Sequence, residues 1–215
     1  FERKHSGPYL GSMQESPVAT SPSSGAANTV MLRNGEFVYD TIDLDYATRA
    51  QTIAVSRTYR SQAKNDGPFG PGWFFNHGQF LTVADDLTLR RWISSRGRYA
   101  ELWTNRPPMK GMFLKYVINY TFDSDSGPYK IIDPHRNELH FNLDGSLRLA
   151  KDRLGNFLRY RYDEKAQLIE LLDPHQRALS FEYWTEADPV EPETVGRIKR
   201  ITDFAGRSID YEYYG

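Results

Sequence analysis

Acidic and histidine side chains recur in the second half of the chain in a pattern that could bind a metal ion. Asp133 and His135 occupy the same places around a proline as Asp173 and His175. Carboxylates and imidazoles are both common zinc ligands. Two related segments, however, carry Leu154 and Ala205 at the position that His135 and His175 occupy. The pattern therefore favours solvent-facing turns, and we expect neither a bound metal nor a cofactor.

Two short segments resemble ligand-binding loops. The string GPFGPGW at 67–73 is glycine-rich like a phosphate loop, but it lacks the Gly-Lys-Ser/Thr ending, and its prolines have no N–H to donate. The string DSDSG at 123–127 alternates acids as calcium loops do, but no glutamate stands at the twelfth position. We interpret the second as a hairpin turn and the first as a fixed turn that presents Trp73 to the core. This pre-repeat turn comprises Gly67, Pro68, Phe69, Gly70, Pro71, Gly72 and Trp73.

The usual signatures of catalysis are missing from the sequence. The chain has no cysteine and no Gly-x-Ser-x-Gly elbow. His5 and His77 have no apparent partner, although a Ser-His-Asp triad assembled only in space stays open. Most of the acids fall at turn starts, where aspartate has a structural role. We therefore predict that the chain is not an enzyme and has no catalytic residues.

Alternating apolar and polar residues indicate the elements that position these groups. Val38, Ile42, Leu44 and Tyr46 recur at period two, which predicts that they share one face of a strand. The segment 114–122 alternates in the same way. No segment keeps the spacing of an amphipathic helix. The prediction is an all-β protein of antiparallel hairpins with little or no helix.

Four segments that begin with aspartate repeat along the second half. Each reads as aspartate, a few turn residues and a strand that ends in an aromatic, so each is one hairpin of a repeating, spiralling sheet. The aspartate would start the turn and the aromatic would fill the inner face. An acidic loop at 184–196 is inserted before the last segment. The structural residues of the repeats are Asp133, Asp152, Gly155, Tyr160, Tyr162, Asp163, Asp173, Phe181, Tyr183, Asp203, Gly206, Tyr211 and Tyr213.

Composition limits the partners. The net charge of -1 provides no basic excess for nucleic acid, and no apolar run is long enough to span a membrane. Arginines alternate with aromatics in two strands and could stack on sugars or bases. Cross-strand ion pairs with Asp210, Glu212 or Glu182 are the favoured interpretation. The arginines concerned are Arg57, Arg60, Arg159 and Arg161.

The chain divides into three parts by these patterns. Residues 1–28 are rich in Ser, Pro, Gly and Ala and are expected to form a flexible linker or tail. Residues 29–130 form a pre-repeat β region, and residues 131–215 form the four hairpin repeats. The segments 33–76, 152–183 and 196–213 carry the pre-repeat glycine-proline string and the tyrosine-aspartate repeats. In these segments the chain resembles the YD-repeat family, the bacterial Rhs proteins and the animal teneurins.

The resemblance implies a function. In that family a long sheet spirals into a hollow shell that encloses a C-terminal toxin or effector. We therefore expect an early structural segment of such a shell, whose partners are the downstream shell repeats, the enclosed cargo domain and a secretion apparatus, and which is secreted or delivered to a cell surface. The alternative is a cell-surface or glycan-binding module that uses exposed aromatics and arginines. An open edge at Tyr211–Tyr213 also predicts self-association.

Overall fold

The computed structural model describes residues 26–47, 52–83, 89–103, 115–118 and 127–214. These residues form an all-β protein, as predicted, with a one-turn 3₁₀ helix at Pro192–Thr194 as the only helical element among them. Within the predicted strand 114–122, the described part is the strand β10 (Lys115–Ile118). The rest of that segment and most of the predicted 123–127 turn lie outside the described residues.

The first sheet is built by the pre-repeat region. It has the order β1-β2-β3-β6, with antiparallel pairing throughout. Its first strand begins at Ala26, so residues 26–28, which we expected in the linker, are strand; residues 1–25 lie outside the described part. The four strands are β1 (Ala26–Met31), β2 (Glu36–Ala47), β3 (Thr52–Arg60) and β6 (Trp73–Phe75).

A β-bulge in β2 overturns the prediction of one shared apolar face. Ile42 lies opposite Ser56, whereas Leu44 lies opposite the adjacent residue, Val55. Paired residues share a face and adjacent residues point to opposite faces, so the bulge places Ile42 on the other face from Leu44. Ile42 is accordingly exposed, while Leu44 and Tyr46 are buried. The extra residue at the bulge is Asp43.

Two smaller sheets complete the pre-repeat region. The predicted glycine-proline turn is a short two-stranded hairpin, and a three-stranded meander follows it. The hairpin consists of β4 (Asp66–Gly67) and β5 (Gly70–Pro71), and the meander of β7 (Phe80–Val83), β8 (Leu89–Ile93) and β9 (Tyr99–Trp103).

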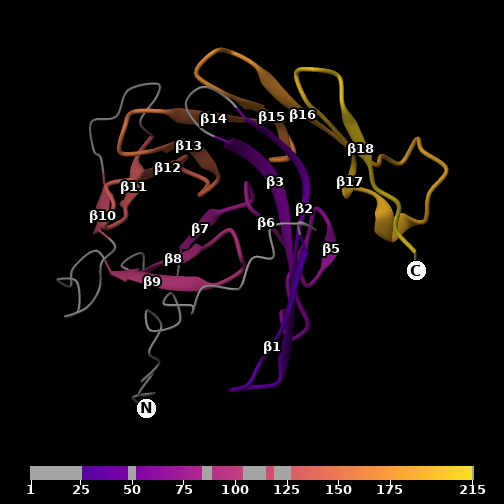
Figure 1. The fold of residues 1–215 in the computed structure, drawn as a ribbon, viewed down its shortest axis with the longest axis horizontal. Helices are drawn as coiled ribbons and strands as arrows, with labels where there is room; N and C mark the ends of the chain where they lie inside the picture. The colour runs from indigo at the N-terminus through magenta and orange to yellow at the C-terminus, as the bar shows by residue number, and fades with distance from the viewer. Residues whose placement is uncertain (1–25, 48–51, 84–88, 104–114, 119–126, 215) are drawn as a thin grey trace.

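The second half of the chain is one nine-stranded antiparallel sheet whose strands follow chain order. It forms an arch over the pre-repeat sheets (Figure 1). The four aspartate-led segments all belong to this sheet. Its strands after β10 are β11 (Tyr129–Ile132), β12 (Glu138–Phe141), β13 (Leu147–Lys151), β14 (Phe157–Tyr162), β15 (Leu168–Leu172), β16 (Ala178–Tyr183), β17 (Ile198–Thr202) and β18 (Ser208–Asp210).

The turns of this sheet lie along two edges. The aspartate edge carries the turns that start at Asp133, Asp152, Asp173 and Asp203. The opposite, loop edge carries the turns that start at Asn142 and Asp163, and the inserted loop 184–197. The arch is therefore a meander with one kind of turn along the aspartate edge and more variable connections along the loop edge.

Each of the six turns uses the same hydrogen bonds. The first residue donates its N–H to the carbonyl four residues on, and its own carbonyl accepts from the N–H three residues on. In the five turns that start with aspartate, one carboxylate oxygen also accepts the N–H groups two and four residues on, at 2.8 to 3.0 Å. Asn142 takes this place in the remaining turn. Asn142 therefore holds the position in its turn that Asp163 holds in the next turn of the same edge.

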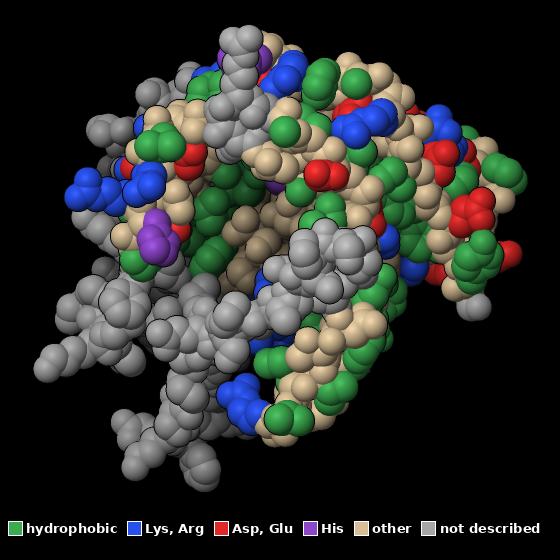
Figure 2. Space-filling model, viewed as in Figure 1, with side chains coloured by type: hydrophobic (Ala, Val, Ile, Leu, Met, Phe, Trp, Pro, Cys, Tyr) green, Lys and Arg blue, Asp and Glu red, His purple; other side chains and the backbone are tan. Residues whose placement is uncertain are grey.

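The arch has an apolar inner face and a polar outer face. Its inner side chains pack on the pre-repeat sheets in one core, so these sheets fill part of the concave side. Figure 2 shows a hollow on this face, with hydrophobic side chains at its walls. The outer face carries cross-strand ion pairs, such as Arg161–Glu170. The core residues contributed by the arch are Ile131, Phe141, Leu147, Tyr160, Leu168, Leu171, Leu179, Phe181, Ile198, Ile201 and Tyr211.

Gly155→Ala tests the backbone requirement of the turns. Gly155 has φ +91°, and no atom lies within 4 Å of the place that a Cβ would occupy, so alanine there meets strain but no clash. We expect a loss of about 1–2 kcal/mol in unfolding free energy, measured by urea denaturation. Ala166 holds the same turn position at φ 59°, and Ala166→Gly is the reciprocal control, expected to be neutral or stabilising. Equal destabilisation by both substitutions would contradict this account.

Candidate functional site

The strands of the arch diverge toward the loop edge, and tyrosines bridge the gap. The backbone pairing of β13 with β14 ends at Leu149–Arg159. Beyond that point the Tyr162 hydroxyl donates to the carbonyl of Leu147 at 2.8 Å. The same kind of bond joins Tyr183 to Leu168 at 3.0 Å and Tyr213 to Ile198 at 2.9 Å. In all three pairs the accepting carbonyl lies fifteen residues before the tyrosine. Each tyrosine thus provides a donor to a backbone carbonyl that the strand pairing no longer reaches.

Two of these tyrosines also lie at bulges. The register of β14 with β15 shifts between Arg161 and Tyr162, and that of β16 with β17 shifts between Glu182 and Tyr183. Burial raises the pKa of Tyr162 and of Tyr183 well above the usual range, so both hydroxyls remain protonated donors. Tyr162 and Tyr183 therefore contribute to the packing of the arch, and neither hydroxyl has a free proton for chemistry.

A partly buried arginine, Arg57, joins the pre-repeat sheet to the last hairpin of the arch. The Arg57 guanidinium binds both carboxylate oxygens of Asp43, at 2.5 and 2.9 Å. It also lies over the rings of Phe69, Trp73 and Tyr211, at 5.2, 4.8 and 4.9 Å from their centroids. These contacts combine charge-assisted hydrogen bonds with cation–π attraction. We call these five residues the arginine junction.

Asp43 connects the two halves of the junction. The Tyr211 hydroxyl donates to the Asp43 carboxylate at 2.9 Å, across 168 residues of sequence. Burial lowers the pKa of Arg57, but the hydrogen bond and charge of Asp43 outweigh it, so the pKa is raised overall. Burial and the Asp43 charge together raise the pKa of Tyr211. The junction therefore stays ionised at Arg57 and protonated at Tyr211 across the neutral range.

The glycine-proline hairpin places Phe69 rather than Trp73 deepest in the core. Phe69 is 3% exposed and makes edge contacts with Phe75 and Tyr211. Trp73 is only half-buried, between the Arg57 guanidinium and the ring of Tyr59. Trp73 packs against the core, as expected, but it is only partly buried, and the tip of the hairpin carries the more deeply buried ring, Phe69.

The same hairpin is bound to the arch through its backbone. The Pro68 carbonyl accepts the N–H of Ile198 at 2.8 Å and lies 3.3 Å from the Tyr213 hydroxyl. Arg197 stacks on the ring of Tyr213 and lies 3.9 Å from the Asp66 carboxylate. The predicted turn residues and the end of the predicted repeats therefore meet at one place.

Three of the four strand arginines form cross-strand ion pairs, but with other partners than we predicted; Arg159 lies over the ring of Phe157. Arg57 binds Asp43 and Arg60 binds Glu36, both within the pre-repeat sheet. Arg161 binds Glu170 on the adjacent strand. Sequence reasoning overlooked Asp43 because the bulge that turns it inward leaves no trace in the alternating pattern.

His77 also has partners that could not be recognised from the sequence. It is 5% exposed, its Nε2 lies 2.8 Å from the Ala54 carbonyl, and its Nδ1 lies 3.2 Å from the Tyr160 hydroxyl. Nε2 therefore carries the proton and Nδ1 accepts. Burial lowers the pKa of His77 to about 4. The neutral imidazole links β3 to β14 and has no nitrogen available for proton transfer.

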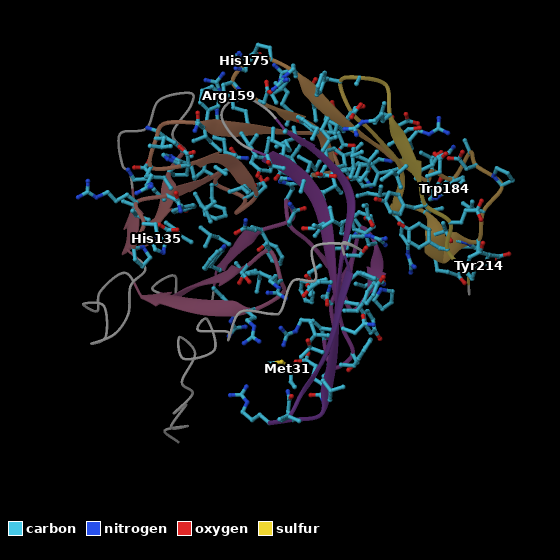
Figure 3. All side chains as sticks on the ribbon, viewed as in Figure 1. Met31, His135, Arg159, His175, Trp184 and Tyr214 are labelled. Atoms are coloured by element: carbon cyan, nitrogen blue, oxygen red, sulfur yellow. The ribbon has the colours of Figure 1, made fainter. Side chains whose placement is uncertain are left out.

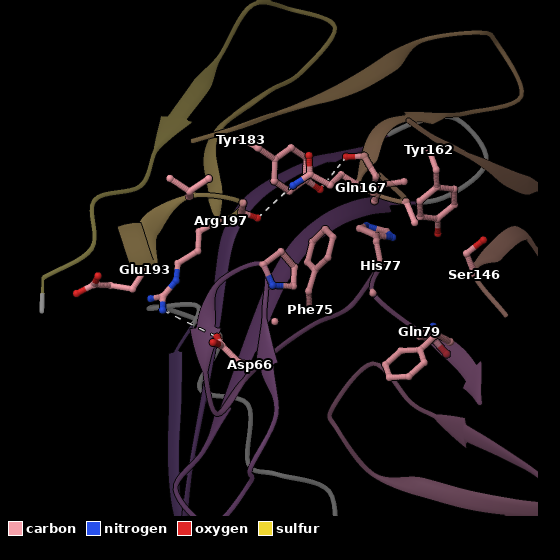
Figure 4. A pocket seen from close by; sticks show the side chains of 18 residues that line it. Asp66, Phe75, His77, Gln79, Ser146, Tyr162, Gln167, Tyr183, Glu193 and Arg197 are labelled. Carbon is pink, nitrogen blue, oxygen red and sulfur yellow. Dashed lines mark hydrogen bonds and ion pairs between the residues drawn. The ribbon is translucent and has the colours of Figure 1, made fainter. Parts of the chain in front are cut away.

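An open cavity of about 490 Å³ lies beside His77 at the loop edge (Figure 4). Its walls come from the glycine-proline hairpin, the segment after β6, two turns of the arch and the inserted loop. Gln167 reaches across to the Gly196 carbonyl at 3.3 Å. Around it the Tyr162 and Tyr183 hydroxyls are bonded to backbone carbonyls. The cavity can accommodate part of another molecule, and among its described wall residues the Ser146 hydroxyl donates to the turn carboxylate of Asp144 at 2.6 Å.

The turn acids are held in structural roles, whereas the turn histidines are exposed. Asp173 is 1% exposed and binds Arg177 at 2.6 Å. Burial opposes the ionisation of Asp173, but N–H groups and the guanidinium of Arg177 lower its pKa overall. His135 and His175 are exposed on the outside of the arch (Figure 3). Within the described residues, no group of three or more His, Asp or Glu side chains could hold a metal ion.

One family model matches this chain. Residues 27–101, less than half of the chain, are similar to a family described as a domain of unknown function, DUF6531. The matched segment covers nearly all of the pre-repeat sheets and contains the glycine-proline hairpin. No curated protein matches the sequence. Across the described residues, no helix has the length and apolar character needed to cross a membrane.

Arg57→Met tests whether the arginine junction stabilises the fold. Removing one partner leaves the Asp43 carboxylate, 8% exposed, with only the Tyr211 hydroxyl. We expect the free energy of unfolding to fall by about 3 kcal/mol in urea titrations. Arg161→Met is the matched control: its side chain is 64% exposed, so the change should stay within about 0.5 kcal/mol. Similar losses in the two variants would refute a special role for the junction.

The free energy of unfolding should decrease as the pH is lowered, because His77 is buried in its neutral form. Its pKa lies at about 4 in the folded state, below the unfolded value near 6.5, so the unfolded chain binds the proton more readily. The stability from neutral His77 is complete above pH 6.5 and is lost as the pH falls toward 4. Between about pH 7 and 5 the wild type should lose about 2 kcal/mol more than His77→Phe.

The comparison isolates His77 because every other titrating group is common to both proteins. His175→Ala, at an exposed turn, should follow the wild-type curve. Parallel pH curves for the wild type and His77→Phe would show that the imidazole is not buried in its neutral form.

Proposed function

We propose that this chain forms the first part of a shell wall of the YD-repeat type, as in Rhs proteins, and that the wall encloses a polypeptide. The observation that carries the proposal is the regular growth of the arch. The turn hydrogen bonds and the tyrosine-to-carbonyl bond recur at fixed positions from one hairpin to the next. A wall built by such a rule can extend by further hairpins.

The pre-repeat region acts as the end piece of this wall. Its sheets fill part of the concave side. His77 attaches it to β14, and Pro68 and the arginine junction both attach it to the last hairpin of the arch. Apolar side chains at the start of the wall are thereby covered. Further along, the same inner face would meet the enclosed polypeptide.

The mechanism is steric. Backbone hydrogen bonds join each of the nine strands to the next, and tyrosine side chains bridge the places where the strands diverge, so adjacent strands would leave no opening wide enough for a protease. An enclosed chain would be kept from water, proteases and the producing cell. The resemblance of the tyrosine-aspartate hairpins to YD repeats supports this role, and it extends the proposal to a secreted or surface-delivered product handled by a secretion apparatus.

The glycan-binding alternative receives less support from the residues that it would need. Tyr160 and Tyr211 are 7% exposed and point into the core. Arg161 and Arg200 on the outer face are paired with Glu170 and Asp210. A bound sugar would have to displace these contacts.

Limited proteolysis of the complete polypeptide that carries these residues tests enclosure. We expect an enclosed segment to resist cleavage until the wall unfolds, because it is sterically inaccessible. Arg57→Met should speed its cleavage at least about tenfold by weakening the end piece, whereas Arg161→Met should leave the rate unchanged. Rapid cleavage of every segment outside the wall in the wild type would refute enclosure.

A further inference from the structure

The first strand of the pre-repeat sheet lacks the features that usually protect an exposed sheet edge. β1 is the outermost strand of its sheet, and among the described strands it pairs only with β2. Exposed edges are commonly protected by charged side chains, by proline or by a β-bulge. Residues 26–32 contain no charged residue and no proline, and β1 pairs with β2 in an unbroken register. This edge is therefore suited to pairing with another strand.

Alternate residues of β1 present their backbone groups to the outer side. Met31 closes the hairpin turn, and its carbonyl accepts the N–H of Gly35 at 2.8 Å, so the backbone groups of Met31 face β2. The hydrogen-bonding groups of successive strand residues point to opposite sides, so those of Asn28 and Val30 face outward. The side chains of both residues, and of Thr29 between them, are exposed. The outer edge thus presents two sets of backbone donors and acceptors on either side of Thr29.

The apolar face of the β1–β2 hairpin continues beyond the arch. Val30 lies opposite Phe37, so these two exposed side chains share one face of the sheet. Four residues further along β2, Thr41 lies opposite Arg57, so the same face reaches the arginine junction and the arch. Leu32, in the hairpin turn, is also exposed. The hairpin extends past the arch, and hydrophobic side chains lie along it (Figures 1 and 2).

A second copy of the chain fits this edge. Two antiparallel β1 strands related by a two-fold axis perpendicular to the sheet keep the apolar faces of both hairpins on the same side. With the axis at Thr29, Asn28 of each copy lies opposite Val30 of the other, and their outward backbone groups form hydrogen bonds. Thr29 then lies opposite its own counterpart, which is a favourable pair, and the two Val30 side chains are diagonal neighbours.

We propose that β1 is a dimerisation edge, at which two copies of the chain pair antiparallel about Thr29 and join their pre-repeat sheets. Because residues 26–32 are uncharged, no like charges meet in this contact. The self-association expected through Tyr211–Tyr213 is less favourable, because Asp210 and Glu212 would bring like charges of two copies together. The contact is short, so the dimer is expected to be weak. The inference goes beyond the wall-forming role proposed above and does not depend on it.

Sedimentation velocity of the 215-residue chain tests the association. We expect a dimer whose fraction rises with concentration. Val30→Lys should weaken it at least about tenfold, because it replaces an apolar contact by two like charges near the axis. Leu154→Lys makes the same change in charge at an exposed turn of the arch, and it should leave the dimer as in the wild type. A monomer at every concentration, or equal weakening by both substitutions, would overturn the proposal.

Single cysteines report the register, since the chain has none of its own. Under copper-catalysed oxidation by air, Thr29→Cys should form a disulfide-linked dimer, because directly opposed residues of a non-hydrogen-bonded antiparallel pair have Cα atoms about 4.5 Å apart. Asn28→Cys should not link to itself, because its equivalent lies diagonally at about 7–8 Å. Mixed with Val30→Cys, it should form the mixed dimer.

Leu154→Cys, on the exposed turn, is the control for random collision. Its rate of disulfide formation should be at least about tenfold below that of Thr29→Cys, because only the latter is held opposite its counterpart. Linkage of Asn28→Cys to itself, or equal rates for Thr29→Cys and Leu154→Cys, would overturn the proposed pairing.

Discussion

The divergence of the strands toward one edge is the constraint on which this structure depends. A sheet that curves into an arch cannot keep every strand paired along its full length, and a carbonyl left without a donor in an apolar surrounding is costly. The tyrosine hydroxyl solves this at each hairpin. It reaches the carbonyl of Leu147, Leu168 or Ile198, and its ring fills the space that the divergence opens. The curvature of the arch and the tyrosine-to-carbonyl bonds therefore depend on each other.

The aspartates that start the turns on both edges also provide partners for backbone groups. A five-residue turn with φ above zero at its fourth residue leaves N–H groups pointing inward, and the carboxylate accepts two of them. Glycine is used at Gly155 and Gly206, but Arg136, Ala166 and Gln176 hold the same conformation. The turn is thus specified more by the aspartate than by the glycine.

The sequence was sufficient for the fold class and for the hairpin order, because both follow from local patterns. Period-two alternation and turn residues are visible wherever a strand and its turn are adjacent in the chain. Asp43 and His77 could not be found in this way. Asp43 points inward only because a bulge shifts the register after Ile42, and His77 is buried only because β3 and β14 meet around it. Such features depend on packing between distant segments.

The same distant contacts set this wall apart from a simple repeat array. In an ordinary solenoid each repeat contacts only its neighbours, and stability adds up along the chain. Here Asp43 binds Tyr211, and the Asp45 carbonyl accepts from Arg207, across more than 160 residues. The last hairpin consequently gains part of its stability from the second strand of the chain. Closing so long a loop costs entropy before the contact is made, so the arch should acquire its final hairpin late and together with the pre-repeat sheet.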